Sequence, residues 1–371
     1  MEYSEDIPAI GLHVPTVTDS EIVATAHLGS VGQPECQILT GGIDPLGPIS
    51  IETWNDGRLW RWRFGGVPSG RQVDILLKYH GRTVRRPIQT MPTPSGPRRV
   101  RWAHLPDTHF CTGRAPKKGR LRDRSEEVLL KTLDDLRGLE VEWLVITGDI
   151  VDGAGSRDDA VAAKRALDGC GIPYAVVPGN HDLEVRQTRQ WCKTWGRRRS
   201  YYAEERDGIR WLMLDTARGD LSDAQHEWLG KQLEKDRNVP TCLCTHWPVM
   251  LRDGELESSF PSSEYLLEKI AIHPHVIAIY GGHKHWTAHI VRKAVHQVVS
   301  GEITIYPCTY TVIDVHDSGW WHHTRQIGDL SLVEQSYDDI GDGTTEKWLA
   351  GRWGDANDRS FVIPTRPPGN V

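Results

Sequence analysis

The feature that most constrains the fold is a short apolar run followed directly by a polar motif, a pairing that occurs five times. The runs are rich in Val, Ile, Leu and Tyr, as expected for strands buried on both faces, and they span residues 100–105, 141–146, 174–177, 241–244 and 276–280. Helical periodicity lies between them. Three residue pairs have helix N-cap spacing: Asp123 with Glu126, Ser156 with Asp159, and Ser222 with Gln225. This alternation predicts an α/β layered domain.

The motif after each run contains residues that can bind metal ions. In chain order the motifs are Asp107-Thr108-His109, Gly148-Asp149-Ile150-Val151-Asp152, Gly179-Asn180-His181-Asp182, Thr245-His246 and Gly282-His283-Lys284-His285. Ligands of α/β sheets gather beyond the carboxyl ends of the strands, so these motifs should meet at one edge. A single Gly-Asp or Asn-His dipeptide often only makes a turn. The order and placement of all five motifs together indicate a site.

The residues before this region have a different pattern. Over positions 1–95, short alternating or β-branched runs are separated by Gly, Pro and Asp, which predicts a small all-β sandwich resembling fibronectin type III or immunoglobulin domains. A turn-rich linker follows at 91–97. The α/β domain is predicted to span 99–335, with paired strands at 303–315 and 320–325 closing its second sheet. Residues 336–371 are predicted to form an extended arm that packs on the same chain or on a partner.

Composition adds limits but little positive information. The 371 residues suggest two domains, and a hydrophobic content of 38% with 25% charged residues is typical of a soluble globular protein. A formal charge of −6 gives no global reason to expect nucleic acid or an anionic membrane. Neither a signal sequence nor a run of about 20 apolar residues is visible, so no membrane partner is expected. Seven cysteines without a Cys-x-x-Cys pair favour free thiols in the cytoplasm over disulfides or thiolate zinc.

With these motifs, the sequence over roughly residues 100 to 315 resembles the calcineurin-like metallophosphoesterases. The resemblance implies a four-layer α-β-β-α sandwich with a dinuclear centre at one edge, preceded here by the small all-β domain. It also implies a ligand set, in which Asp149 bridges the two ions. The first ion would take Asp107, His109 and His285, and the second would take Asn180, His246 and His283. Imidazole nitrogen and carboxylate oxygen suit Fe, Mn and Zn.

The resemblance also implies roles beside the ligands. Two metal ions can bind a phosphate ester and activate a water molecule for in-line attack. His181 would contact the phosphate and protonate or stabilise the leaving oxygen. Asp152 and Asp182 are expected to orient ligands or to hydrogen-bond the turn backbone.

His109 and Asp152 help to separate subfamilies. Purple acid phosphatases also join an N-terminal β-domain to such a catalytic domain, but they lack a histidine at the position of His109 and have a tyrosine at that of Asp152. The motifs here look more like bacterial cyclic-nucleotide and glycerophosphodiester phosphodiesterases. Phosphodiester hydrolysis is therefore favoured, phosphomonoester hydrolysis of the acid or protein phosphatase type is the alternative, and a non-catalytic interaction module is the least favoured.

Basic residues follow the first motif, over positions 114–122, and a second basic run lies at 197–199. Lys117, Lys118 and Arg120 are candidates for binding the substrate phosphate, and Trp286 is a candidate for lining the pocket. A solvated surface explains the basic residues more simply, and packing explains Trp286 more simply. Because of these two basic runs, a nuclease remains an alternative function, although a small phosphate ester is the favoured substrate. A homo-oligomer through the N-terminal domain or the C-terminal arm is a further open alternative.

Overall fold

The computed structural model describes residues 10–28, 32–41, 44–153, 156–183, 188–252, 260–340 and 346–365. The start of the predicted N-terminal domain, residues 1–9, lies outside this range, as do residues 341–345 and 366–371 of the predicted arm. All of the candidate site residues lie within it.

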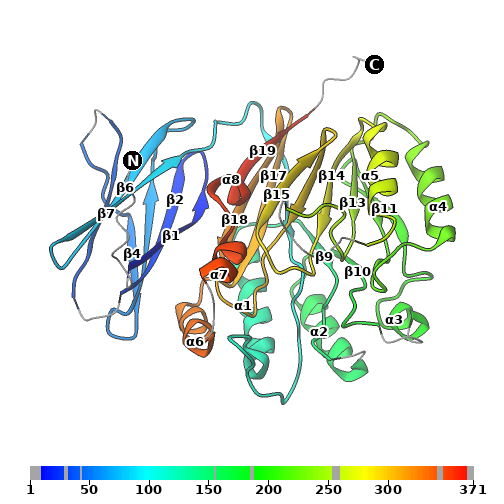
Figure 1. Cartoon of the computed structure of the whole chain (residues 1–371), viewed down its shortest axis with the longest axis horizontal. Helices are drawn as coiled ribbons and strands as arrows, with labels where there is room; N and C mark the ends of the chain where they lie inside the picture. The colour runs from blue at the N-terminus through cyan, green and yellow to red at the C-terminus, as the bar shows by residue number, and fades with distance from the viewer. Residues whose placement is uncertain are drawn as a thin grey trace.

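The described residues of the N-terminal region form a sandwich of two antiparallel sheets and contain no helix (Figure 1). One sheet has the order β1 (Ile10–Val17), β2 (Glu21–Leu28), β5 (Leu59–Gly65) and β4 (Ser50–Trp54), and the other has β3 (Glu35–Leu39), β6 (Gln72–Tyr79) and β7 (Arg82–Gln89). Alternate side chains of β6, such as Val73, Ile75 and Leu77, are buried against Trp62 and Phe64 of β5. The predicted all-β fold is confirmed, because a period of two gives each strand one core face.

The remaining chain forms two six-stranded sheets that pack face to face. The first has the order β10 (Tyr174–Val177), β9 (Trp143–Thr147), β8 (Arg98–His104), β17 (Thr309–His316), β18 (Gly319–Gln326) and β19 (Ser360–Pro364). The second has β11 (Tyr202–Arg206), β12 (Ile209–Met213), β13 (Thr241–Cys244), β14 (Val276–Gly281), β16 (Val295–Val299) and β15 (Ala288–Arg292). Aromatic side chains fill the space between them: Trp102 meets Trp211 and Tyr280 edge to face, each at 4.8 Å between ring centroids.

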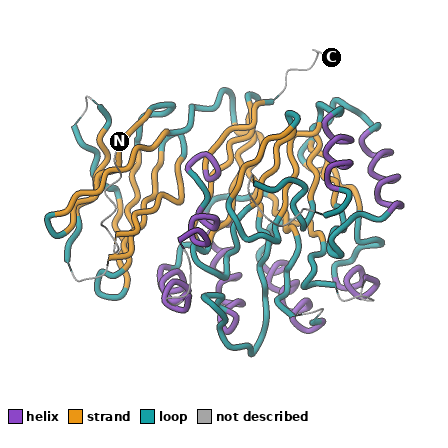
Figure 2. Tube along the Cα trace, viewed as in Figure 1, coloured by secondary structure: helices purple, strands orange, loops and turns teal. Residues whose placement is uncertain are grey.

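Helices cover the outer faces of both sheets, as Figure 2 shows in purple. Buried residues of α1 (Ser125–Gly138), α2 (Arg157–Gly169) and α3 (Thr188–Thr194) pack on the first sheet, and those of α4 (Asp223–Leu233) and α5 (Ser263–Ala271) pack on the second. The predicted four-layer α-β-β-α sandwich is therefore confirmed. Apolar runs buried on both faces were a reliable signal, because each strand here lies between a helix layer and the other sheet.

Two local predictions hold and one is wrong. Ser156 Oγ accepts a hydrogen bond from Asp159 N at 3.3 Å, and Ser222 Oγ accepts one from Gln225 N at 3.4 Å, so both serines cap their helices. Asp123 caps nothing, since a 3₁₀ turn occupies 122–124 and α1 begins only at residue 125.

The strands predicted at 303–315 and 320–325 belong to the first sheet, not to the second. β17 pairs antiparallel with β8, and it begins only at Thr309. The preceding residues, 303–308, instead pack at the ligand edge, where Thr304 O accepts a hydrogen bond from Leu121 N at 2.8 Å. Pro307 lacks an N–H to donate to a ladder, which accounts for the late start of the strand.

The C-terminal segment packs on the protein's own body. It contributes α7 (Glu346–Trp353), α8 (Ala356–Arg359) and β19, which adds to β18 at the edge of the first sheet. The predicted arm boundary at residue 335 falls inside α6 (Leu330–Ile340). In Figure 1 these orange and red helices lie between the N-terminal sandwich and the sheets. The division into domains at 95, 99 and 335 stays a prediction.

The N-terminal sandwich is joined to these C-terminal elements by polar and aromatic contacts. His13 stacks on Trp353 at 4.4 Å between ring centroids, and His27 stacks on Tyr337 at 3.9 Å. The buried Arg61 guanidinium donates hydrogen bonds of 2.7 Å to the carbonyls of Ile327 and Gly328.

All seven cysteines are buried and unpaired. Cys242 and Cys244 lie in the core between the sheets, as their spacing in a strand predicts. Within the described part of the chain, no helix is both long and apolar enough to cross a membrane.

Candidate metal centre

The five motifs meet at one edge of the two sheets, because each follows the carboxyl end of a strand. Asp107 follows β8, Asp149 follows β9 and Asn180 follows β10, three parallel neighbours in the first sheet. His246 follows β13, and His283 and His285 follow the adjacent parallel strand β14 in the second sheet. The facing sheets therefore bring together residues separated by up to 178 positions in the sequence.

The first ligand group consists of Asp107, His109, Asp149 and His285. His285 Nε2 lies 3.2 Å from His109 Nε2 and 3.4 Å from Asp107 Oδ1, while His109 Nε2 lies 3.9 Å from Asp149 Oδ2. Atoms bound to a single ion at about 2.1 Å lie roughly 3.0 to 3.4 Å apart. Two imidazole nitrogens that converge in this way, beside two carboxylates, fit a bound cation.

The second group consists of Asp149, His246 and His283, with the amide of Asn180 beside it. His246 Nε2 lies 2.9 Å from Asn180 Oδ1, 3.3 Å from Asp149 Oδ2 and 3.3 Å from His283 Nδ1. Nδ1 of His246 lies 2.9 Å from Thr147 O, a carbonyl that can only accept, so that nitrogen carries a proton and Nε2 faces the other ligands. Asp149 belongs to both groups, as a bridging ligand must.

The electrostatics of the centre match this arrangement. Burial alone would raise the pKa of Asp149, but His246, and after it His109 and His181, hold that pKa below its usual value. For His246, burial lowers the pKa, and the carboxylates of Asp149 and then Asp107 raise it to about 9. A cation bound between these groups would replace that proton.

Five of the seven proposed ligands have left-handed backbone conformations, which are uncommon for residues other than glycine. Their φ angles are 53° at Asp107, 41° at His109, 47° at Asp149, 68° at His283 and 55° at His285. Strain of this kind costs on the order of 1–3 kcal/mol per residue and gathers at functional sites. Sharp turns after β8, β9 and β14 therefore direct these five ligands across the edge.

Neighbouring glycines allow the loops to approach closely. A Cβ at position 179 would lie 2.2 Å from Asp149 N, and one at 282 would lie 2.4 Å from Asp107 Oδ2. Only glycine fits at these two positions. The Gly-Asn-His-Asp and Gly-His-x-His motifs therefore owe their first residue to packing against the neighbouring ligand.

Asp152 and Asp182 lie where the sequence places them, beside the ligands. Asp182 Oδ1 accepts hydrogen bonds from the backbone N–H groups of Ile150 and Val151 at 2.9 and 3.1 Å, and its Oδ2 accepts one from Gly179 N at 2.8 Å. It thereby joins the two loops that carry Asp149 and Asn180. Asp152 Oδ1 lies 3.3 Å from His109 Nδ1.

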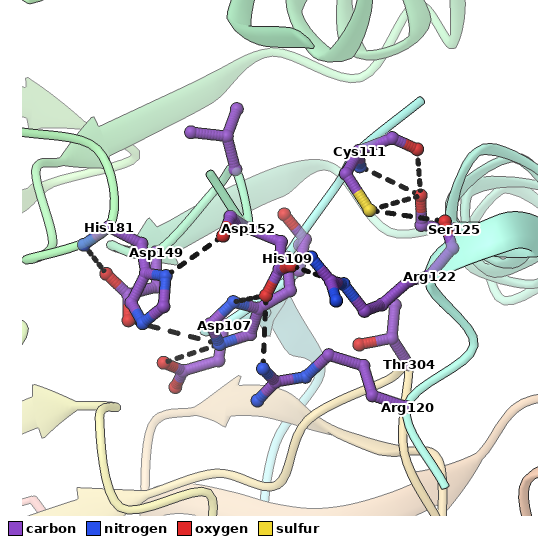
Figure 3. Close-up of polar contacts among 12 residues, drawn as sticks. Asp107, His109, Cys111, Arg120, Arg122, Ser125, Asp149, Asp152, His181 and Thr304 are labelled. Atoms are coloured by element: carbon purple, nitrogen blue, oxygen red, sulfur yellow. Dashed lines mark hydrogen bonds and ion pairs between the residues drawn. The ribbon is translucent and has the colours of Figure 1, made fainter. Parts of the chain in front are cut away.

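His181 is partly exposed at the rim of the centre, and Figure 3 shows it beside Asp149 and Asp152. Its backbone N–H donates to Asp149 Oδ1 at 2.7 Å, and its ring Nδ1 lies 3.2 Å from Asp152 O. Because a carbonyl can only accept, Nδ1 carries a proton, and the other ring nitrogen is left for proton exchange.

Comparison with known proteins agrees with this geometry. A sequence model described as calcineurin-like phosphoesterase matches residues 100–287. The chain belongs to the calcineurin-like phosphoesterase family. It is therefore a hydrolase of phosphoric ester bonds, in a family that uses a dinuclear metal centre.

Two individual relatives share only 26–30% of their residues with this chain over the matched regions. A glycerophosphodiester phosphodiesterase of Enterobacter lignolyticus is 26% identical over 244 residues, which cover 62% of this chain and 83% of the relative. A probable cyclic nucleotide phosphodiesterase of Fibrobacter succinogenes is 30% identical over 179 residues, which cover 45% and 68%. Among solved structures, a dimetal phosphatase from Danio rerio superimposes with a TM-score of 0.54 at 15% identity, covering 63% of this chain and 98% of that one. This structural likeness concerns the fold alone.

The basic run after the first motif faces largely inward. Arg114, Arg120 and Arg122 all approach Asp152, with nitrogen to oxygen distances of 3.6, 3.1 and 2.7 Å. Figure 3 shows Arg120 and Arg122 reaching toward this carboxylate. The guanidinium of Arg120 is thus engaged by carboxylates of the protein. Lys117 and Lys118 are exposed, and Trp286 is partly exposed against α7; their contact with substrate stays a prediction.

Two neighbours of the ligands were missed by sequence reasoning. The ring of Trp247 stacks on that of His283 at 3.7 Å and 23°, and the Glu302 carboxylate lies 3.0 Å from His285 Nδ1. Trp247 directly follows the ligand His246. Glu302 stands shortly after β16, a strand parallel to β14, so the rule of strand carboxyl ends, applied once more, would have found it.

Proposed function

We propose that this protein hydrolyses phosphodiesters at a two-metal centre. Asp107, His109 and His285 would hold one ion, Asn180, His246 and His283 would hold the other, and Asp149 would bridge them. The observation that carries the proposal is that the two separate ligand groups share Asp149. The ions could be Fe, Mn or Zn, and when bound they would neutralise phosphate charge and activate water for in-line attack.

The chain's own residues would prepare the site for this reaction. Asp182 would fix the loops that carry Asp149 and Asn180, and Asp152 would orient His109. The partly exposed His181 would donate a proton to the leaving oxygen. The Nδ1 contact with Asp152 O holds the ring in one orientation, so that only the opposite nitrogen exchanges protons with the substrate.

Diesters are favoured over monoesters by the phosphodiesterase names of the two relatives and by His109, which lies inside the first ligand group. The proposed substrates are small phosphodiesters, such as cyclic nucleotides or glycerophosphodiesters. Lys117, Lys118 and Trp286 remain candidates for contacting the part of the substrate beyond the phosphate.

The test compares bis(p-nitrophenyl) phosphate with p-nitrophenyl phosphate on one Mn-loaded preparation, with Asp149→Ala as the control. We expect the diester to be cleaved with the larger kcat/KM and the variant to be inactive. Faster cleavage of the monoester would replace the proposal with a phosphomonoesterase. Cleavage of oligonucleotides with a binding constant that falls steeply as salt rises would replace it with a nuclease.

The compartment is a separate part of the proposal. We propose the cytoplasm, because burial raises the pKa of thiols such as Cys36 and Cys308, each to about 12, and none of the seven cysteines forms a disulfide. Cell fractionation with an antibody against the native protein would test this, and recovery in an extracytoplasmic fraction would contradict it.

A further inference from the structure

Two of the proposed ligands have a buried carboxylate on the side of the ring that faces away from the metal site. His109 Nδ1 lies 3.3 Å from Asp152 Oδ1, and His285 Nδ1 lies 3.0 Å from Glu302 Oε2. A carboxylate at this position favours the proton on Nδ1 and leaves the Nε2 lone pair for a metal ion. Nε2 of each ring does face the other ligands. Glu302 thus stands in the same relation to His285 as Asp152 does to His109.

Arg120 joins these two carboxylates. Its Nε and Nη2 donate hydrogen bonds to Glu302 Oε1 and Oε2 at 2.6 and 3.1 Å, and its Nη1 donates one to Asp152 Oδ1 at 3.1 Å. Thr304 Oγ1 donates a further bond of 2.5 Å to Glu302 Oε1. The Glu302 side chain is fully buried, and these partners offset the cost of its desolvation. They also hold the carboxylate in a single orientation. A carboxylate fixed in this way can fix the ring beside it.

A second cation reaches Glu302 from the C-terminal segment. Arg352 of α7 is buried, and its Nη1 lies 3.7 Å from Glu302 Oε2 while the guanidinium stacks on Trp348 at 4.0 Å. Among the described residues, Nε and Nη1 of Arg352 have no hydrogen-bond partner, and Glu302 is the carboxylate that lies within ion-pair distance of this buried charge.

The backbone of α7 is also attached to the ligand loop. Thr287, two residues after His285, donates from its N–H to Gly351 O at 3.3 Å and from its hydroxyl to Arg352 O at 2.9 Å. The helix that carries Arg352 therefore cannot shift without moving the loop that carries His285.

We propose that Glu302 is a positioning residue for the ligand His285, and that Arg352 makes helix α7 part of the support of the metal centre. This inference rests on the proposed ligand role of His285, but not on the identity of the substrate. It assigns a function in metal binding to the C-terminal segment, although Arg352 lies 245 positions after the first ligand, Asp107, in the sequence.

The test is a double-mutant cycle with Mn²⁺ alone, measured by calorimetry on the full-length, metal-depleted chain. The variants are Glu302→Gln, His285→Ala and the double variant. We expect Glu302→Gln to weaken Mn²⁺ binding about 10- to 100-fold, and we expect no further loss when it is added to His285→Ala. Glu334→Gln is the matched control, because Glu334 is equally buried but contacts Asn55 of the N-terminal sandwich; it should bind Mn²⁺ normally.

An equal loss in both backgrounds would overturn the proposal, because Glu302 would then act independently of His285. Unchanged affinity in Glu302→Gln would also overturn it. If His285→Ala itself binds Mn²⁺ normally, the ligand assignment is wrong, and the inference fails with it. Absence of diester cleavage by the parent protein, with the coupling intact, would remove only the proposed substrate.

Should Glu302→Gln not fold, Arg352 provides the second route. Arg352→Met keeps the bulk of the side chain and removes its charge, whereas Arg352→Lys keeps the charge. We expect weaker Mn²⁺ binding in Arg352→Met, and recovery toward the parent value in Arg352→Lys. Parent-like binding by Arg352→Met would overturn the role of α7.

Discussion

The two halves of the ligand cluster share Asp149 but are supported by different chemistry. In the first half, the carboxylates of Asp152 and Glu302 lie beside Nδ1 of His109 and His285, on the side of each ring away from the metal site. Arg120 forms ion pairs with both carboxylates. In the second half, His246 is oriented by the neutral carbonyl of Thr147, and His283 stacks on Trp247. A carboxylate makes an imidazole a more basic ligand as well as orienting it, whereas a carbonyl or an aromatic ring mainly orients it. The protein thus fixes one half by charge and the other by dipoles and packing.

The largest effect is expected where the halves join. Asp149→Ala should leave no measurable cleavage of the diester, since both ions lose the shared ligand and its charge. Metal analysis after Mn²⁺ loading should show loss of both ions, whereas Asn180→Ala should lose only one. Equal losses in the two variants would mean that Asp149 does not bridge the halves.

A smaller effect is expected for His181, which lies at the rim of the first half. His181→Asn should lower kcat for the hydrolysis of diesters with an alkoxide leaving group by about 100-fold or more, because an alkoxide must be protonated as it leaves. The loss for bis(p-nitrophenyl) phosphate should be smaller, since p-nitrophenolate departs without one. Comparison of kcat for the two leaving groups is the measurement. An equal loss for both would indicate a structural role.

The contrast between charged and neutral support can be tested with one variant in each half. Asp152→Asn should weaken Mn²⁺ binding by about 10-fold, because His109 loses its carboxylate. Thr216→Val removes the hydroxyl that accepts from His246 N and Trp247 N at 2.9 and 3.0 Å. It should cost about 1–3 kcal/mol of unfolding free energy, with Mn²⁺ stoichiometry unchanged. If both variants weaken Mn²⁺ alike, the halves do not differ in the way proposed.

The smallest effect should come from outside both halves, at the contact between the N-terminal sandwich and the C-terminal segment. Burial, followed by Arg359 for His13 and by Arg58 for His27, lowers the pKa of each ring from 6.5 to about 3. Between these values the unfolded chain binds more protons, so stability is complete above pH 6.5 and falls as the pH decreases. Both rings keep some contact with solvent, so we expect about 1 kcal/mol from each by pH 5.

Denaturant unfolding at pH 7 and pH 5 would measure this loss. His13→Phe should reduce it, because phenylalanine can still stack on Trp353 but does not titrate. The reduction should be the same with and without Mn²⁺. A pH dependence that His13→Phe leaves unaltered would assign the loss to other groups.

The elements of the catalytic domain could be predicted in detail where local chemistry dominates. Strands β10 and β13 have the predicted bounds, and the serine caps at 156 and 222 form as expected. One strand prediction failed where the segment depends on a distant neighbour: residues 303–308 resemble a strand but pack against Leu121. The segment after residue 335 was expected only as an extended arm, and the structure adds that it contains α7, α8 and the edge strand β19. No local pattern encodes such partners.

The sequence by itself determined the layered fold and the candidate ligands, because both follow from short-range rules: a period for each element, and a ligand motif at each strand end. Only the tertiary structure decided which carboxylates the buried arginines pair with. Arg120 looked like a phosphate contact, yet its guanidinium is engaged by Asp152 and Glu302, and the C-terminal Arg352 lies beside the same carboxylate. The reason is physical: a buried charge needs a nearby opposite charge, and folding can supply it from any part of the chain.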